Sequence, residues 1–351
     1  MPAAISAFSL PAQLEAGEPP EARGVRRDGV RLMAAHVRGG RIAHARFRDL
    51  PALLEPGDLL VVNASATLPA AIAADGPDGA PLLLHFATRA PLEDGDQWWV
   101  LEARSPDGAR PARGAERPRT GDTLALAGGG MVEIVAPYAR GGRLLLARVE
   151  TAHPVVDHLG RHGRPIRYGY VEGTWPLGDY QTIFATTPGS AEMPSAGRPF
   201  TPALLARLRA RGVASAEIVL HTGVSSAEAH EPPYPEQYRV PASTAAQVNA
   251  ARASGGRIVA VGTTVVRALE TVASPEGSIR AGAGWTDLVV TPERPPRAID
   301  GLISGWHEPE ASHLQMLEAV AGRELLARCY DAALDHGYLW HEFGDSHLIL
   351  P

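Results

Sequence analysis

The sequence contains no lysine, so all 33 side chains counted as Lys or Arg are arginines. This absence excludes a lysine Schiff base and the lysine of a phosphate-binding P-loop. Arginine binds phosphate well, but a GC-rich coding sequence explains the bias more simply. Cysteine is nearly absent as well, because Cys329 is the single one. It excludes an internal disulfide, and we expect a protein of the reducing cytoplasm.

Long apolar runs are also missing. No window approaches about 18 uninterrupted apolar residues, which argues against a membrane-spanning helix. The N-terminal segment has no basic region, and prolines interrupt its apolar stretch, so we expect no signal peptide. The net charge of −6 argues against a protein that coats nucleic acid without specificity, although it leaves room for a local basic surface.

Several motifs of common enzyme classes are absent. The chain has neither G-x-G-x-x-G nor a Walker A motif, and no G-x-S-x-G elbow supports a serine hydrolase. His341 and His347 are six residues apart rather than the four of H-E-x-x-H, and no carboxylates cluster at ligand spacing. We therefore expect no zinc and no other metal.

The 351 residues, 45% of them hydrophobic, suffice for two domains or for one large core with an insertion. An α/β pattern opens at 40–63, where a strand, a short helix and a second strand lead into the polar loop 63–67. Ligands of open α/β sheets commonly bind at such strand ends.

The pattern changes between about 75 and 150. Short β-like runs alternate with glycine-rich turns and predict antiparallel hairpins that form a small barrel or a curled sheet. The runs are Leu82–Thr88, Trp98–Glu102, Thr123–Leu126, Val132–Ala136 and Arg143–Val149. We expect the arginine-rich segment 105–119 to be a poorly ordered loop, and solvation explains its charges better than contact with RNA.

Elements of the α/β type return after residue 150. Caps and apolar periodicity predict a helix from Thr201-Pro202 to Arg211, a strand over 217–221, a helix from Ser243 to Ala253, a strand over 258–261, a helix over 265–272, a helical region from Ser312 to about His336 and a last strand over 345–350.

The clearest local feature is the strand, G-T-T turn and helix at 258–272. Gly262 lets the backbone approach a ligand closely, and amides at the start of a helix attract anions or polar groups. Arg267 and Glu270 share one face of this helix, so we expect them to face a pocket or to pair beside it. Such turns are common in α/β proteins, and this one is weak evidence alone.

Two further segments are candidates for a site. The polar loop 180–197 is too long to be a mere connector, and loops of this kind usually carry function. His221 ends a predicted strand, although a lone histidine is more often structural than catalytic.

Taken in order, these segments resemble those of one family. The series is Y-Q-T-I-F-A, P-G-S, P-S-A-G-x-x-F-T, a strand ending in L-H, R-I-V-A-V-G-T-T-x-V-R-x-L-E, T-D, D-x-L-I-x-x-x-H-x-P and F-G-D, preceded by P-G-D-L-L-V-V-N at 56–63. On these motifs the chain resembles the S-adenosylmethionine:tRNA ribosyltransferase-isomerases of queuosine biosynthesis over nearly its whole length.

The resemblance implies an α/β fold, with an α/β core at 1–73 and 152–351 and an inserted antiparallel β-barrel domain at 74–151. It also implies an enzyme that transfers the ribosyl part of S-adenosylmethionine, its co-substrate, to 7-aminomethyl-7-deazaguanine in tRNA. The ribosyl group is rearranged to an epoxycyclopentane, and adenine and methionine are released. The sulfonium is itself the activating cation, so no metal is required. We expect a cytoplasmic monomer whose partner is tRNA and which binds no membrane.

Site residues follow from the resemblance position by position. It implies catalytic roles for His221, Arg267, Glu270 and Asp345. It implies substrate-binding roles for Tyr180, Gln181, Thr182, Pro194, Ser195, Ala196, Gly197, Gly262, Thr263, Thr264 and His307. We expect S-adenosylmethionine near the 262–264 turn and the 194–197 loop.

The chain departs from the family pattern at several polar positions. Pro199 replaces a histidine of G-L-H-F, and the segment 232–238 lacks two histidines of H-x-x-H-x-E-Y, with the amide of Gln237 in place of a carboxylate. An N-T-R loop reads Ala-Ser-Ala at 64–66, and Val265 replaces a serine.

Three interpretations therefore stay open. The chain is a tRNA enzyme with compensating residues such as His230 or Glu236, a paralogue that uses S-adenosylmethionine on a small-molecule acceptor, or a binding protein that keeps only the fold. If Pro199, Pro232, Pro235 and Gln237 line one cleft with His221 and Glu270, that cleft is drier and transfer to tRNA is weak.

Overall fold

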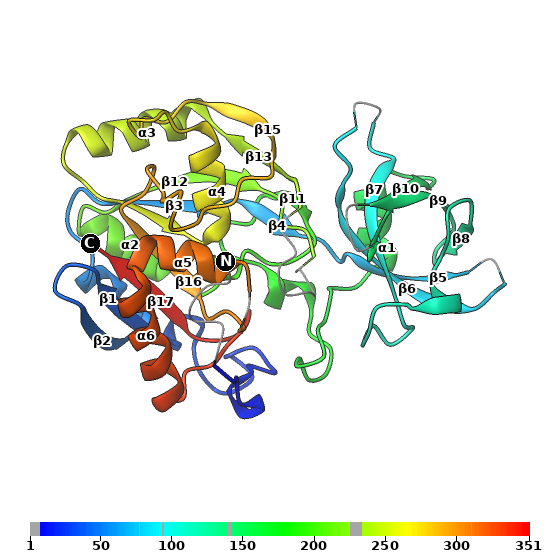
Figure 1. Ribbon diagram of the computed structural model, residues 1–351, viewed down its shortest axis with the longest axis horizontal. Helices are drawn as coiled ribbons and strands as arrows, with labels where there is room; N and C mark the ends of the chain where they lie inside the picture. The colour runs from blue at the N-terminus through cyan, green and yellow to red at the C-terminus, as the bar shows by residue number, and fades with distance from the viewer. Residues whose placement is uncertain (1–7, 77, 93–94, 139–141, 225–233, 310) are drawn as a thin grey trace.

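The computed structural model describes residues 8–351 except 77, 93–94, 139–141, 225–233 and 310. Two bodies lie side by side in it, an α/β core on a nine-stranded mixed sheet and a closed six-stranded antiparallel barrel (Figure 1). The predicted fold, an α/β core with an inserted antiparallel β-barrel, is confirmed. None of the described helices is long and apolar enough to cross a lipid bilayer.

The large sheet brings distant segments of the chain together. Its strands, in spatial order, are β15 (Gly282–Thr286), β13 (Glu236–Val240), β12 (Ala214–Leu220), β3 (Leu59–Asn63), β14 (Ile258–Val261), β16 (Gly301–Gly305), β17 (Ser346–Leu350), β1 (Arg31–His36) and β2 (Arg41–Arg46). The four neighbours β12, β3, β14 and β16 run parallel, so their carboxyl ends meet at one edge. The candidate site forms at that edge.

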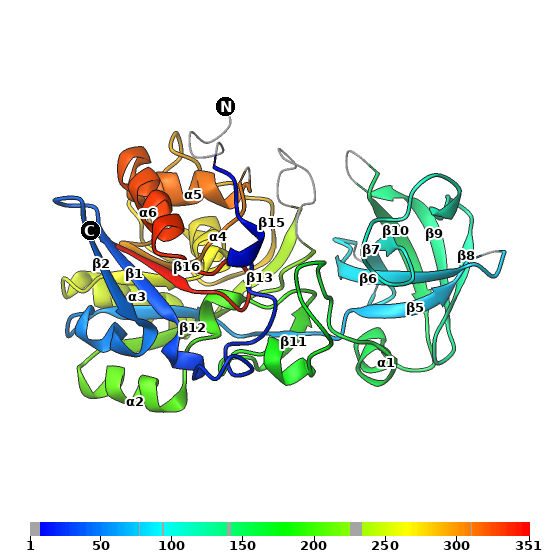
Figure 2. The ribbon, with the colours of Figure 1, turned by 90° about the horizontal axis from the view of Figure 1, so that it is seen from below.

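Helices cover both faces of this sheet (Figure 2). One face packs against α3 (Ala242–Ala253), α4 (Thr263–Val272), α5 (His313–Ala321) and α6 (Arg323–Asp335), and the other against α2 (Pro202–Ala210) and the 3-10 helix η3 (Phe47–Ala52). Alternation along the strands serves both layers, since Val61 of β3 packs with the first group and Val62 with the second. The central strands are therefore apolar on both faces, as their continuous apolar runs predict.

The barrel has its own core. Its strands close in the order β10 (Leu144–Glu150), β7 (Trp98–Arg104), β6 (Pro81–Arg89), β5 (Ala71–Asp75), β8 (Thr123–Leu126) and β9 (Met131–Tyr138), and α1 (Val155–His162) packs against them. All five predicted runs are strands. β5 was not predicted, because its alanine-rich sequence carries little β propensity of its own.

Short elements connect the two bodies. The parallel pair β4 (Ser65–Thr67) and β11 (Thr187–Ser190) fastens the loop before the barrel to the loop after it. The remaining 3-10 turns are η1 (Ala12–Leu14), η2 (Arg27–Gly29), η4 (Gly114–Glu116), η5 (Leu177–Tyr180) and η6 (Ser195–Gly197). The segment predicted as a polar loop at 63–67 thus contains a short strand.

Several details differ from the sequence-based expectations. Ser243 lies inside α3, which begins after Pro241, and the long C-terminal helix is two helices separated by Gly322 at φ 76°. The arginine-rich segment 105–119 contains η4 and an ion pair between Arg110 and Glu116, with an N–O distance of 2.7 Å. The segment therefore has local structure that its composition does not reveal.

Candidate functional site

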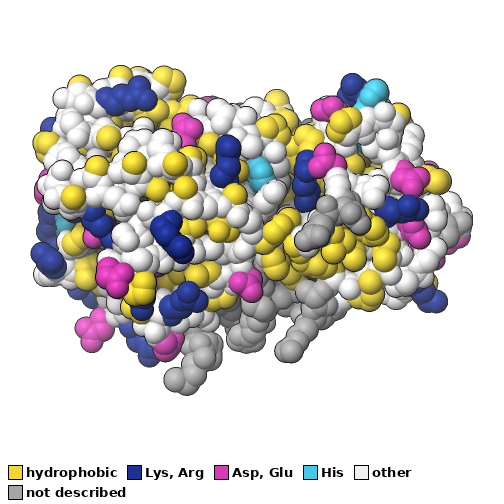
Figure 3. Space-filling model, turned by 90° about the horizontal axis from the view of Figure 1, so that it is seen from above, with side chains coloured by type: hydrophobic (Ala, Val, Ile, Leu, Met, Phe, Trp, Pro, Cys, Tyr) yellow, Lys and Arg dark blue, Asp and Glu magenta, His cyan; other side chains and the backbone are white. Residues whose placement is uncertain are grey.

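A cavity of about 600 Å³ lies between the carboxyl edge of the large sheet and the barrel. Thr222, Gly262 and Ser304 line it from the ends of three core strands, while Thr88 and Leu144 line it from barrel strands. Figure 3 shows apolar side chains gathered where the two bodies meet. The position agrees with the rule that ligands of open α/β sheets bind at the carboxyl ends of strands.

The G-T-T turn forms part of the cavity floor. Gly262 has φ 99° and ψ 152°, a conformation open almost only to glycine, and its N–H donates to the carbonyl of Ile303 on β16. Thr263 and Thr264 start α4 and line the cavity, and a β-carbon on Gly262 would lie 3.5 Å from that of Ala196. The turn and the 194–197 loop are therefore in contact, and the binding of S-adenosylmethionine near them stays a prediction.

Arg267 lies one turn further along α4 and is 7% exposed. Its guanidinium forms an ion pair with Glu236 and donates to the carbonyls of Leu288 (3.0 Å), Thr286 (3.0 Å) and Tyr234 (3.4 Å). The other oxygen of Glu236 accepts the N–H of Gly223 at 2.8 Å. Arg267 thus faces the cavity as predicted, but its donors are largely used by the protein, so its surroundings are those of a positioning residue.

Glu270 does not lie in the cavity. Its carboxylate accepts the backbone N–H groups of Arg297 (2.7 Å) and Ala298 (2.6 Å), and desolvation raises its pKa above the ordinary value. The expectation that Glu270 faces the pocket or pairs with Arg267 is wrong. The three-residue spacing places both on one broad face of α4, but Arg267 points to the strand ends and Glu270 to the loop before β16.

Two histidines lie at the start of the loop and helix that follow β16. His307 Nε2 is 2.8 Å from the hydroxyl of Ser304, and the His307 and His313 rings stack with centroids 4.6 Å apart. Burial lowers the pKa of His307 well below its ordinary value, so its ring is neutral at pH 7. Burial also lowers the pKa of His313, to about 4. Both rings line the cavity, where they act as neutral hydrogen-bonding groups rather than cations.

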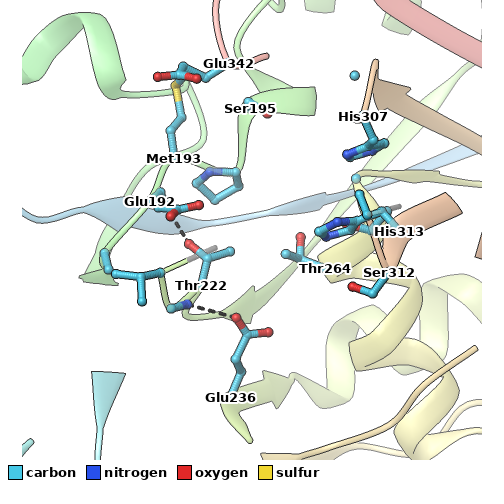
Figure 4. A pocket seen from close by; sticks show the side chains of 18 of the residues that line it. Glu192, Met193, Ser195, Thr222, Glu236, Thr264, His307, Ser312, His313 and Glu342 are labelled. Carbon is cyan, nitrogen blue, oxygen red and sulfur yellow. Dashed lines mark hydrogen bonds between the residues drawn. The ribbon is translucent and has the colours of Figure 1, made fainter. Parts of the chain in front are cut away.

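Tyrosines and carboxylates form another wall of the cavity. Tyr170 donates its hydroxyl to Glu342 (2.5 Å), and Tyr168 donates its hydroxyl to Glu192. Figure 4 shows Glu342 and Glu192 on the same side of the cavity with Met193 between them, facing His307 and His313 across it. Tyr180, a predicted site residue, also lines the cavity and is 4% exposed.

His221 lies beside the cavity rather than in it. Its Nδ1 is 2.7 Å from the hydroxyl of Ser65, which is 2.6 Å from that of Ser190, and its ring packs on Gly189, where a β-carbon would come within 2.4 Å. Burial lowers the pKa of His221 to about 4. The next residues, Thr222 and Gly223, do line the cavity. The structure thus places His221 as a support for the strand end.

Other predicted site residues hold the loops that carry the cavity wall. Gln181 makes two hydrogen bonds to the backbone of Thr67, and Thr182 accepts the N–H of Phe184. Gly197 packs against Thr182. Of the predicted binding residues, those that line the cavity are Tyr180, Pro194, Ser195, Ala196, Gly262, Thr263, Thr264 and His307. Gln181, Thr182 and Gly197 lie behind this layer.

Asp345 is also set apart from the cavity. It accepts the N–H groups of Arg31 (2.6 Å) and Leu339 (2.9 Å), and burial raises its pKa. It joins β1 to the turn before β17 and borders only a small second hollow. The predicted catalytic position therefore corresponds to a structural contact in this chain.

The altered positions do not form one cluster at the cavity. Pro199 borders the second hollow, Pro235 lines the cavity, and Pro232 lies outside the described residues, as does His230. Gln237 follows Glu236 on β13, and successive strand residues point to opposite faces, so Glu236 reaches the cavity and Gln237 does not. The cleft keeps a carboxylate from this segment.

Sequence reasoning missed much of the lining. From the sequence alone, Glu236 is indicated only as a compensating residue, and His341-Glu342 only as part of a metal motif that does not fit. Also missed were Arg104, Arg143, Tyr168, Tyr170, Glu192, Thr222, Trp306, Ser312 and His313. The barrel residues carry no local signal, because only the docking of barrel and core brings them to the cavity.

Comparisons with known proteins agree in name and extent. A family model described as "Queuosine biosynthesis protein" matches residues 5–349. The S-adenosylmethionine:tRNA ribosyltransferase-isomerase of Moorella thermoacetica is 37% identical over 373 residues, 98% of this chain and 98% of the relative. A protein of the same name from Thermus thermophilus is 37% identical over 336 residues, 92% and 93% of the two chains.

A solved structure extends this similarity to the fold. The crystal structure of S-adenosylmethionine tRNA ribosyltransferase from Thermotoga maritima superposes with a TM-score of 0.54 at 29% sequence identity. The match covers 99% of this chain and 100% of that one, so it includes both the core and the barrel.

Proposed function

The chain belongs to the queuosine-biosynthesis family of S-adenosylmethionine:tRNA ribosyltransferase-isomerases, and we propose that its core–barrel cavity is the site of that reaction. The observation that carries the proposal is the meeting of the G-T-T turn, the 194–196 loop and His307 in one cavity of about 600 Å³. Such a volume is in the range of small-molecule sites.

The residues present fit S-adenosylmethionine as the co-substrate. The molecule combines a carboxylate, an ammonium, a sulfonium and an apolar purine. The first turn of α4, at Thr263 and Thr264, offers backbone N–H groups to an anionic group. The carboxylates of Glu192 and Glu342 suit a cationic group, and Tyr180 and Trp306 supply flat apolar surface.

The reaction requires a base and a hydrogen-bond donor. The sulfonium acidifies the adjacent carbon, so the base there does not have to be strong. His307 lines the cavity with its Nε2 2.8 Å from the Ser304 hydroxyl, and on this position we assign it the role of proton acceptor. Its lowered pKa makes it a weak base, so the step depends on the acidity that the sulfonium gives to the carbon. The hydroxyls of Thr264 and Ser312 line the same space and can hydrogen-bond the departing adenine.

On the basis of the family, the proposed acceptor is a 7-aminomethyl-7-deazaguanine base in tRNA. The proposed place of action is the cytoplasm, where a tRNA-modifying enzyme meets its substrate. A small-molecule acceptor is the second candidate, because arginines at and around the barrel are paired within the protein. Arg104 pairs with Glu102, Arg89 with Asp96, and Arg110 with Glu116. These carboxylates reduce the positive potential that tRNA phosphates would meet.

Calorimetry with S-adenosylmethionine tests the location of the site. Ser195→Trp places an indole in the cavity, whereas Ser254→Trp adds the same side chain at the exposed end of α3. We expect the wild type and Ser254→Trp to bind alike and Ser195→Trp to lose binding. A wild type that does not bind, or a Ser195→Trp variant that binds normally, would refute the proposal.

A further inference from the structure

Glu342 occupies an unusual place in the cavity wall. It lies in the turn between α6 and β17, and its hydrogen bond comes from the neutral hydroxyl of Tyr170. The Tyr170 ring stacks on His341 with centroids 3.8 Å apart and lies 6.0 Å from the ring of Tyr168. The stacked ring thus positions the hydroxyl that donates to Glu342.

Glu342 lacks a directly bound arginine within the described part of the chain. None of the described arginines forms an ion pair with it. The favourable fields that reach it come from the neighbouring His341 and, more weakly, from Arg198, which is bound to Glu21 (2.9 Å) and to the carbonyl of Asp179 (2.9 Å). Burial raises the pKa of Glu342, which means that the charged form is poorly solvated. A carboxylate in this setting is stabilised by a cation brought from outside.

The residue before Glu342 gives an independent indication of a ligand site. His341 has φ 69°, and it is the only non-glycine residue of the described chain with a positive φ. Its side chain lines the cavity and is 7% exposed, and its Nε2 makes no hydrogen bond among the described residues, with the Glu15 carboxylate 3.5 Å away. Strained backbone at residues other than glycine concentrates at ligand and active sites.

We propose that Glu342, positioned by Tyr170, binds a primary ammonium group of a substrate in the cavity. A charge-assisted hydrogen bond to the carboxylate favours such a group. The inference rests on the proposed function, which supplies two sources of this chemistry. One is the α-ammonium of S-adenosylmethionine, and the other is the aminomethyl group of the acceptor.

Calorimetric titration and steady-state kinetics of Glu342→Gln together separate the two sources. The substitution keeps the shape and removes the charge. If the α-ammonium binds there, affinity for S-adenosylmethionine falls roughly ten- to hundredfold, the range expected for a hydrogen bond to a charged group. The deaminated analogue of S-adenosylmethionine, which keeps the sulfonium, then binds the variant and the wild type alike. If the acceptor amine binds there, S-adenosylmethionine affinity is unchanged and KM for the aminomethyl acceptor rises by a similar factor.

Two further variants control this test. Tyr170→Phe keeps the ring and removes the donor, so it should give a smaller change in the same parameter as Glu342→Gln. Glu15→Gln alters a carboxylate 3.5 Å from the other side of His341 and outside the cavity, and it should change neither parameter. Thermal unfolding of each variant checks that it is folded.

The outcomes distinguish this inference from the proposed function. A wild type that binds S-adenosylmethionine, together with a folded Glu342→Gln that matches it in both affinity and acceptor KM, overturns the role of Glu342 alone. A wild type that fails to bind S-adenosylmethionine overturns the proposed function and the inference with it.

Discussion

Two regions of the cavity wall differ in whether the protein itself neutralises their charged side chain. On the α4 side, Arg267 is matched by Glu236 and by three backbone carbonyls, so its charge is satisfied before any ligand arrives. On the opposite side, Glu342 is held by a neutral tyrosine hydroxyl and has no arginine partner within the described residues. The first arrangement fixes three segments to one another, and the second leaves charge for a ligand to neutralise.

The source of the partners of an ion therefore distinguishes supporting residues from binding residues in one cavity. A buried ion whose partners all come from the protein is a positioning group, and its removal damages the fold before it damages recognition. Removal of a buried ion with weak protein partners should instead weaken ligand recognition before it damages the fold. Variants on each side of the cavity, and at comparable positions deeper in the core, test this distinction.

The largest effect is expected for Arg267→Met. The substitution leaves Glu236 without its cation, and breaking a buried ion pair typically costs about 3–5 kcal/mol. Chemical denaturation should show a loss of that size. Adding Glu236→Gln to this variant should recover part of it, since no unpaired charge then remains. A single-variant loss below about 1 kcal/mol would show that the Arg267 network is not structural.

The second largest effect is a loss of stability in acid. Its cause is His347, a core residue whose ring nitrogens make no hydrogen bond among the described residues. His347 is 0% exposed, stacks on Trp306 with centroids 4.7 Å apart, and has no hydrogen-bond partner for either ring nitrogen among the described residues. Burial lowers its pKa to about 3. The contribution of neutral His347 to the stability of the fold is therefore complete above the ordinary histidine pKa, near 6.5. This stability declines as the pH falls towards 3.

Replacement of His347 by phenylalanine isolates this contribution. Between pH 7 and pH 5 the wild type should lose about 2 kcal/mol more stability than His347→Phe, since each unit below the unfolded pKa costs about 1.4 kcal/mol. Urea titrations at both pH values measure the difference. Parallel curves for the two proteins would mean that His347 binds a proton equally well when folded.

A smaller effect is expected for Gly262→Ala. The φ of 99° at Gly262 is strained for any residue with a β-carbon, which should cost about 1–2 kcal/mol and tilt the start of α4. We expect lower stability together with weaker S-adenosylmethionine binding. Gly160→Ala is the control, because it lies in α1 with open space around its Cα and should be neutral or slightly stabilising. Equal behaviour of the two variants would contradict the role of the turn.

The smallest effect is expected for Glu270→Gln. Glu270 shares α4 with Arg267 but lies outside the cavity, and an amide oxygen can still accept the N–H groups of Arg297 and Ala298. Binding of S-adenosylmethionine should stay within about twofold of the wild type, the range of substitutions away from a site. A loss of tenfold or more would return Glu270 to the list of catalytic residues.

The fold was largely predictable because its signals are local. Thr201 caps α2 through a hydrogen bond to Leu204 N, and the apolar runs at 59–62 and 258–261 are buried strands, as their sequences predict. Strands β13, β15 and β16 were not predicted, because they are short, contain glycine or polar residues, and depend on pairing with neighbours.

The site was only partly predictable, for a related reason. Gly262, Thr263 and Thr264 were found because one strand, one turn and one helix place them. Arg104 and Glu342 come to the same cavity from a barrel strand and from the C-terminal turn, and nothing nearby in the sequence records that meeting. Roles transferred by resemblance were least secure for Glu270 and Asp345, whose partners in this chain are backbone N–H groups.

The most direct test of the central claim is a product assay. Purified protein is incubated with S-adenosylmethionine, with and without tRNA that carries 7-aminomethyl-7-deazaguanine, and adenine and methionine are quantified. We predict that both products form in equal amounts, that they depend on the tRNA, and that Ser195→Trp forms neither. Failure of the wild type to release adenine and methionine with this tRNA, under conditions in which it binds S-adenosylmethionine, would contradict the assignment.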